Sequence, residues 1–132
     1  MPNVDDPNRS TLVDGGPHIL AANSATWFRF DYARSADPAY RLKDVRLING
    51  NNSGVRFEVW PPNHVNDWWD GNKPVGRGTV YMTDCDTHEY AEEGECPSPD
   101  LIWMGSFNFD GSIYIRVVND NPVPSFFTLK KN

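Results

Sequence analysis

Apolar side chains at every second position of short stretches are the feature that most limits what this chain can fold into. Three stretches show it, at residues 25–32, 55–60 and 113–118. In 55–60, for example, Val55, Phe57 and Val59 alternate with more polar neighbours. Successive side chains of a β-strand point to opposite faces, so a period of two predicts strands with one buried face.

Turn-forming residues separate these stretches. The chain of 132 residues contains 10 Gly and 11 Pro, and residues 49–54, Asn-Gly-Asn-Asn-Ser-Gly, predict a hairpin loop between two strands. Only 37–44 has helical character. Weaker strand patterns occur at 18–21, 42–48, 79–82, 101–104 and 126–129. We expect one all-β domain over residues 1–132, with its core at about 10–130, built as a two-sheet antiparallel β-sandwich of roughly seven to nine strands.

Charge and hydropathy exclude several partner classes. The formal net charge of -6 disfavours binding to nucleic acid or to an anionic membrane surface. No apolar run approaches the roughly 20 residues of a membrane helix, so no membrane insertion is expected. Residues 1–7 lack the basic start and apolar middle of a signal peptide. We therefore expect either an intracellular protein or a segment whose export signal has been removed.

Six runs of strand and turn residues lie at 27–30, 55–60, 74–79, 100–107, 111–117 and 125–129. Together they resemble the bacterial pre-peptidase C-terminal (PPC) domain of extracellular multidomain proteins. This resemblance implies a jelly-roll-like sandwich, a secreted or cell-surface location, and an accessory role beside enzymes or adhesins. Some relatives bind calcium or collagen, but their ligand positions have no clear match here. An acidic loop at 83–99, which contains two cysteines, also departs from the family pattern.

An acidic loop at 83–99 contains both cysteines of the chain, Cys85 and Cys96. The favoured interpretation is a disulfide that closes this loop, which requires an oxidising compartment. A zinc site formed by Cys85, His88 and Cys96 is a second hypothesis, although the spacing fits no common zinc pattern. Calcium is a third, since acidic side chains supply oxygen ligands. The residues proposed for a metal are Asp84, Asp86, His88 and Glu89.

A second loop, at 61–77, is rich in tryptophan. Flat aromatic rings beside carboxylates are what a sugar-binding platform needs, because the rings cover the apolar sugar face and the carboxylates bind hydroxyls. The alternative is that one ring plugs the end of the sandwich and the other covers the sheet. The platform hypothesis assigns ligand binding to Trp60, Asp67, Trp68, Trp69 and Asp70.

No motif of a catalytic nucleophile, a phosphate-binding glycine loop or a paired base stands out, so we expect no enzyme activity and no catalytic residue. The favoured function is a non-catalytic accessory, binding or spacer domain that requires no cofactor. Its expected partners are a glycan or neighbouring protein domains. The alternatives are a carbohydrate-binding module that uses exposed Trp residues, and a structural subunit or repeat of an extracellular surface assembly.

Overall fold

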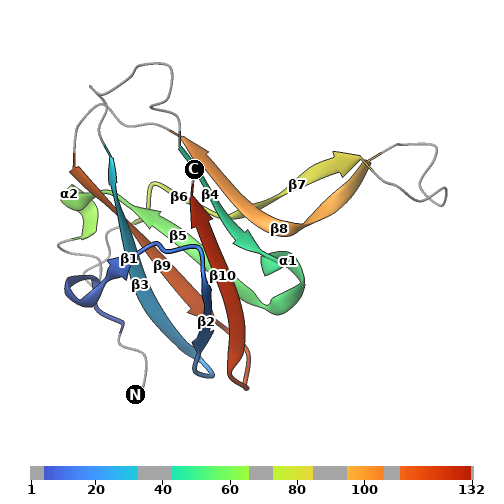
Figure 1. Ribbon diagram of the computed structural model, residues 1–132, viewed down its shortest axis with the longest axis horizontal. Helices are drawn as coiled ribbons and strands as arrows, with labels where there is room; N and C mark the ends of the chain where they lie inside the picture. Colours follow the sequence, from blue (N-terminus) through green and yellow to red (C-terminus); the bar gives the residue numbers. More distant parts are fainter. Residues whose placement is uncertain (1–4, 33–42, 66–72, 85–94, 106–110, 132) are drawn as a thin grey trace.

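The computed structural model describes residues 5–32, 43–65, 73–84, 95–105 and 111–131 (Figure 1). No helix in these ranges is longer than four residues. The helical turns are η1 (Pro7–Arg9), α1 (Gly50–Ser53) and α2 (Pro62–Val65). The strands are β1 (Thr11–Leu12), β2 (Pro17–Leu20), β3 (Ser24–Tyr32), β4 (Lys43–Ile48), β5 (Val55–Trp60), β6 (Gly76–Arg77), β7 (Thr79–Asp84), β8 (Glu95–Gly105), β9 (Gly111–Asn119) and β10 (Ser125–Lys131).

The strands form two facing sheets. The β3 sheet has the order β1-β3-β9-β5-β6, and the β10 sheet has the order β2-β10-β4-β8-β7. Neighbouring strands run antiparallel, except that β1 pairs parallel with β3. From β2 to β5, and again from β8 to β10, the chain changes sheet at every connection, which is the jelly-roll arrangement. The prediction of an all-β, two-sheet antiparallel sandwich of jelly-roll type is confirmed.

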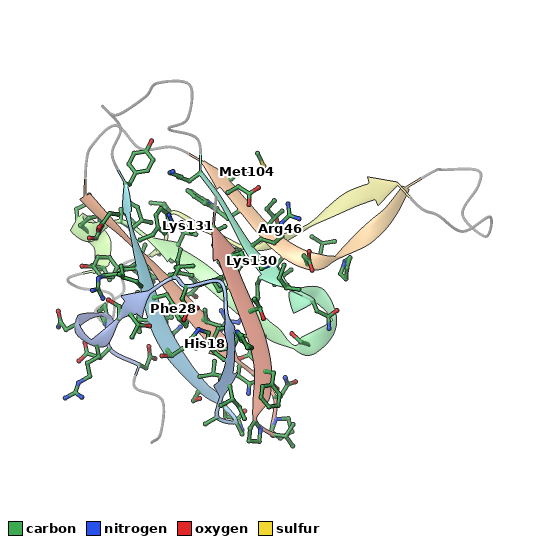
Figure 2. All side chains as sticks on the ribbon, in the orientation of Figure 1. His18, Phe28, Arg46, Met104, Lys130 and Lys131 are labelled. Atoms are coloured by element: carbon green, nitrogen blue, oxygen red, sulfur yellow. The ribbon has the colours of Figure 1, made fainter. Side chains whose placement is uncertain are left out.

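The core lies between the sheets and is built by the predicted alternation. Side chains at every second position of β3, β4, β5, β9 and β10 are buried between the sheets. Burying one such side chain stabilises the fold by about 1.5–3 kcal/mol. His18 closes one side of this core, because its ring lies 5.0 Å from the Phe28 ring and 5.5 Å from the Phe127 ring (Figure 2). The largest fully buried core side chains include Leu20, Phe30, Tyr32, Leu47, Phe57, Ile113, Ile115 and Leu129.

The loop at 49–54 is not the predicted hairpin. It leads from β4 in the β10 sheet to β5 in the β3 sheet, and so crosses between sheets. The expected positive backbone angles are present, with φ of 59° at Asn49 and 77° at Gly54. These angles reverse the chain around α1, and they do not determine which sheet receives the next strand.

Other differences concern short or extended elements. The described residues form ten strands, where seven to nine were expected. The expected number was too low because β1 and β6 are each two residues long, too short to produce an alternating pattern. Residues 43 and 44 belong both to the weak strand pattern at 42–48 and to the helical stretch at 37–44, and the structure begins β4 there. The rest of 37–44 lies outside the described residues. β8 is longer than expected, and its first half pairs with β7 in a two-stranded arm that extends from the sandwich (Figure 1).

Candidate functional site

The outer face of the β3 sheet is covered by the chain itself. Trp27 and Trp60 lie on this face, with ring centroids 6.0 Å apart, and their side chains are 1% and 3% exposed. Val65 packs on them, because α2 folds back directly after β5 with a bond from Val65 N–H to the Pro61 carbonyl. The Trp60 ring is therefore buried, and its assignment to an exposed sugar platform is wrong.

An ion-pair network surrounds these two rings. Arg116 lies between Asp5 and Glu58, with closest nitrogen–oxygen distances of 2.7 and 3.3 Å. The indole N–H of Trp27 donates to Asp5 at 2.7 Å, and that of Trp60 donates to Glu58 at 3.2 Å. The segment before η1 is thereby fastened to the middle strand β9 by charged hydrogen bonds. This face has a structural role.

The network shifts two pKa values. Burial alone would raise the pKa of Asp5, but the hydrogen bonds from Arg116 and Trp27 outweigh burial and hold the pKa below its ordinary value. The pKa of Arg116 is raised, chiefly by its hydrogen bond to Asp5. The unfolded chain therefore binds a proton at Asp5 at a higher pH than the folded chain does. The stabilisation is complete above the unfolded pKa and is lost as the pH falls through the lower folded pKa.

The variant Asp5→Asn should remove this acid-sensitive contribution. We expect the free energy of unfolding to fall at neutral pH by about 1 kcal/mol, a value reduced because the carboxylate is partly exposed. Between about pH 5 and about pH 2, urea denaturation should show a shallower loss of stability in this variant than in the wild type. Asp31→Asn, at an exposed carboxylate, is the control. Equal pH slopes for Asp5→Asn and wild type would contradict the role given to Asp5.

A hydrogen bond between a histidine and a carboxylate lies beside the Phe28 and Phe127 rings. The Nε2 atom of His18 lies 2.9 Å from a carboxylate oxygen of Asp14, and this hydrogen bond is the main cause of a lowered pKa at Asp14. The same oxygen accepts the Gly16 N–H at 2.9 Å, which shapes the turn into β2. These two hydrogen bonds to Asp14 hold the turn in place and orient the His18 ring against the rings of Phe28 and Phe127. The hydrogen bond between Asp14 and His18 therefore has a structural role.

Most of the sequence-predicted site residues lie outside the described ranges. This applies to Asp67, Trp68, Trp69 and Asp70 of the sugar hypothesis, and to Cys85, Asp86, His88 and Glu89 of the acidic loop. Asp84 ends β7 and Cys96 lies in β8, where Thr83 is its cross-strand partner. The Cys85–Cys96 disulfide stays a prediction, and no disulfide is present among the residues described.

The C-terminal part of the tryptophan-rich loop forms a different feature, a short edge strand built on glycine. A Cβ atom at Gly76 would lie under 3.0 Å from the Trp103 indole, and one at Gly78 under 3.0 Å from the Phe57 ring. Glycine at these two alternate positions lets the backbone lie directly on two inward aromatic rings. Arg77, between them, is directed to the opposite face and is exposed.

Two grooves border this strand. The β6–β8 groove has a volume of about 510 Å³, and Val75, Trp103 and Met104 are among its lining residues. The β5–β6 groove has a volume of about 550 Å³, and its lining includes Arg56, Glu58 and Lys73. Pro74 and Arg77 line both grooves, so the two are neighbours that share one wall. This shared wall makes segment 73–79 the candidate functional site.

Charge is uneven around the β5–β6 groove. Three basic side chains line it, and Glu58 is the acidic residue among them. Glu58 is already bound: one oxygen accepts from Trp60 and Arg116, and the other accepts from Arg56 at 3.3 Å. Arg77 lies opposite Glu58 in the β5–β6 register but forms no ion pair with any residue in the described ranges. An anionic group in the groove would therefore meet an available guanidinium.

Run 74–79 contributes to the resemblance to the PPC domain, but neither Lys73 nor Arg77 was predicted to bind a partner. The signal that could have found them is the Gly-Arg-Gly spacing, in which two glycines on one face leave the arginine on the other. The grooves themselves were not predictable, because their walls come from β5, β6 and β8, which are distant in sequence.

Comparison of the chain with models of protein families, with curated proteins and with solved structures found no match. The resemblance to the PPC domain therefore stays a prediction. None of the helices in the described ranges is long and apolar enough to cross a membrane. In the same ranges no three His, Cys, Asp or Glu side chains gather as metal ligands would, while most of the residues proposed for a metal fall outside them.

Proposed function

We propose that this chain is a non-catalytic accessory domain that binds its partner at the β6 edge of the sandwich. The observation that carries the proposal is the contrast between two surfaces. On the outer face of the β3 sheet, the surface around Trp27 and Trp60 is occupied by the protein's own Asp5 and Val65. Segment 73–79, in contrast, borders two open grooves with exposed basic and aliphatic side chains. Binding sites are commonly concave surfaces of this kind on a rigid scaffold.

The same proposal places the domain in a secreted or cell-surface protein and includes the Cys85–Cys96 disulfide. The support comes from the sequence: the two cysteines lie close together, and the PPC-like runs belong to extracellular modules. In the chain-entropy model, closing a loop of this size stabilises the fold by about 3 kcal/mol. The bond would fasten the end of the β7–β8 arm, where the two strands approach the loop.

Nuclear magnetic resonance screening of the labelled chain tests the proposal. Mixtures of peptides and of oligosaccharides are added, amide shifts are recorded, and the mass of each recovered compound is measured. We expect shifts at residues 73–79 and 102–104 with every compound recovered unchanged. A chemically altered compound would make the protein an enzyme.

Shifts confined to 66–72 with a glycan, abolished in the Trp68→Ala/Trp69→Ala variant, would favour the carbohydrate-binding alternative. Self-association on concentration, measured by sedimentation, would favour the surface-assembly alternative.

A further inference from the structure

We infer that the two grooves at β6 form one continuous site for an extended peptide segment that carries an acidic side chain next to aliphatic ones. This inference rests on the proposed function and names the chemical class of the partner. It follows from three properties of the site: an available cation, exposed aliphatic side chains beside it, and a backbone wall that is held rigid.

The cation is Arg77. Its guanidinium belongs to the wall shared by both grooves, and the nearest acidic side chain across the strands, Glu58, is held by three other donors. Lys73 adds a second exposed positive charge at the β5–β6 groove. Arginine binds carboxylates through two parallel hydrogen bonds, which gives both strength and orientation.

The apolar part lies in the β6–β8 groove. Val75 is 47% exposed and Met104 is 57% exposed, and both line this groove together with Ile102. Figure 2 shows Met104 projecting from the end of β8 away from the ribbon. Methionine adapts its shape to different apolar side chains, which suits a surface that binds peptides.

The rigid wall follows from the glycine contacts. Trp103 lies in β8 opposite the buried Val45, and its indole fills the space beside both Gly76 and Gly105. Strand β6 therefore rests on a fixed ring, while Val75 N–H and Gly78 N–H are bonded to β5 at 2.9 and 3.1 Å. A site held in this way loses little entropy when a ligand binds.

A peptide fits these properties better than an acidic polysaccharide does. Sugar sites present an open aromatic face with several hydrogen-bonding side chains around it. In the β6–β8 groove the aromatic residue is Trp103, whose ring points inward and packs against glycine, and the exposed side chains beside Arg77 are aliphatic. Aliphatic side chains next to a guanidinium match a peptide with alternating acidic and aliphatic residues.

Selection of phage-displayed random peptides on the full chain provides the test. We expect enriched peptides with Asp or Glu next to Leu, Ile, Val or Met. A synthetic peptide of the enriched sequence, measured by fluorescence polarisation, should bind about tenfold more weakly to Arg77→Gln than to wild type. Its binding should also weaken when NaCl is raised from about 50 mM to about 500 mM, because the contact is exposed to solvent.

Arg9→Gln is the matched control, since it removes one exposed arginine at η1 and should leave the affinity unchanged. Lys73→Gln is the second variant, in case Arg77→Gln folds poorly by circular dichroism, and should also weaken binding. A peptide whose acidic residues are replaced by Gln should lose affinity in the same way.

The inference is overturned if enriched peptides lack acidic residues, if Arg9→Gln weakens binding as much as Arg77→Gln, or if no peptide is enriched. It is also overturned if oligogalacturonate binds in an Arg77-dependent way while acidic peptides do not. In that last case the proposed function still holds, with a different partner. Chemical alteration of the probe would instead refute the proposed function.

Discussion

Replacing Asn119 with aspartate should lower the free energy of unfolding by about 3 kcal/mol, because this side chain is a fully buried hydrogen-bond donor. Its amide nitrogen lies within 3.1 Å of the carbonyl oxygens of Leu20, Ala21 and Val123. Its amide oxygen accepts the Asn121 N–H at 3.0 Å. Aspartate has nearly the same shape but directs a negative oxygen at those carbonyls, so shape is preserved while every donor is lost.

Urea denaturation of Asn119→Asp and wild type at the same pH measures this effect. Asn8→Asp, at an exposed asparagine whose side chain forms no bond in the described part of the chain, is the control and should change stability by less than about 0.5 kcal/mol. The penalty of Asn119→Asp should be smaller at about pH 4 than at about pH 8, because a protonated carboxyl regains one donor and loses its charge. If Asn119→Asp lowers the free energy of unfolding no more than Asn8→Asp does, the three hydrogen bonds from Asn119 to the carbonyls contribute little to stability.

The strands and their inward faces were predictable, whereas the covering of the outer face was not. Alternation identifies Phe57 and Val59 as one face of β5, and the structure buries both. Trp27 and Trp60 stand at outward positions of the same pattern and are buried nonetheless. Their burial depends on α2 and on Asp5, which reaches Arg116 from 111 positions away in sequence. The alternation of side chains within one strand cannot show which distant segment of the chain packs on its outer face.

The candidate site was predictable only in part. For the tryptophan-rich loop at 61–77 the sequence offered two interpretations, a sugar platform and a packing role. The structure places the last residues of this loop, 73–77, along both grooves. The sequence favoured tryptophan and aspartate side chains for binding, whereas the exposed side chains along the grooves are mainly basic or apolar. The loop at 49–54 shows the same limit, since its turn residues specify positive φ values at Asn49 and Gly54 but not the change of sheet that follows.

Replacing Gly78 with alanine should cost about 2 kcal/mol, because the added methyl group would lie under 3.0 Å from three carbons of the Phe57 ring. That ring is fully buried in the core, so it has little room to turn aside. Where no clash occurs, Gly→Ala in an ordinary backbone conformation stabilises a protein by about 0.4–1 kcal/mol. If Gly78→Ala lowers the free energy of unfolding, the backbone at Gly78 packs directly on the Phe57 ring. If it raises the free energy of unfolding, the two do not meet.

Gly16→Ala is the matched control for this prediction, since a Cβ there would meet only Asp14 at ordinary contact distance, 3.6 Å or more. Thermal and urea denaturation should show Gly16→Ala as neutral or stabilising and Gly78→Ala as destabilising. Phe57→Leu should lower stability by itself, but adding it to Gly78→Ala should cost less than the sum of the two single changes, because the smaller side chain makes room for the methyl group. Strict additivity would mean that Gly78 and Phe57 do not meet, and that the wall of both grooves is held in place by other contacts.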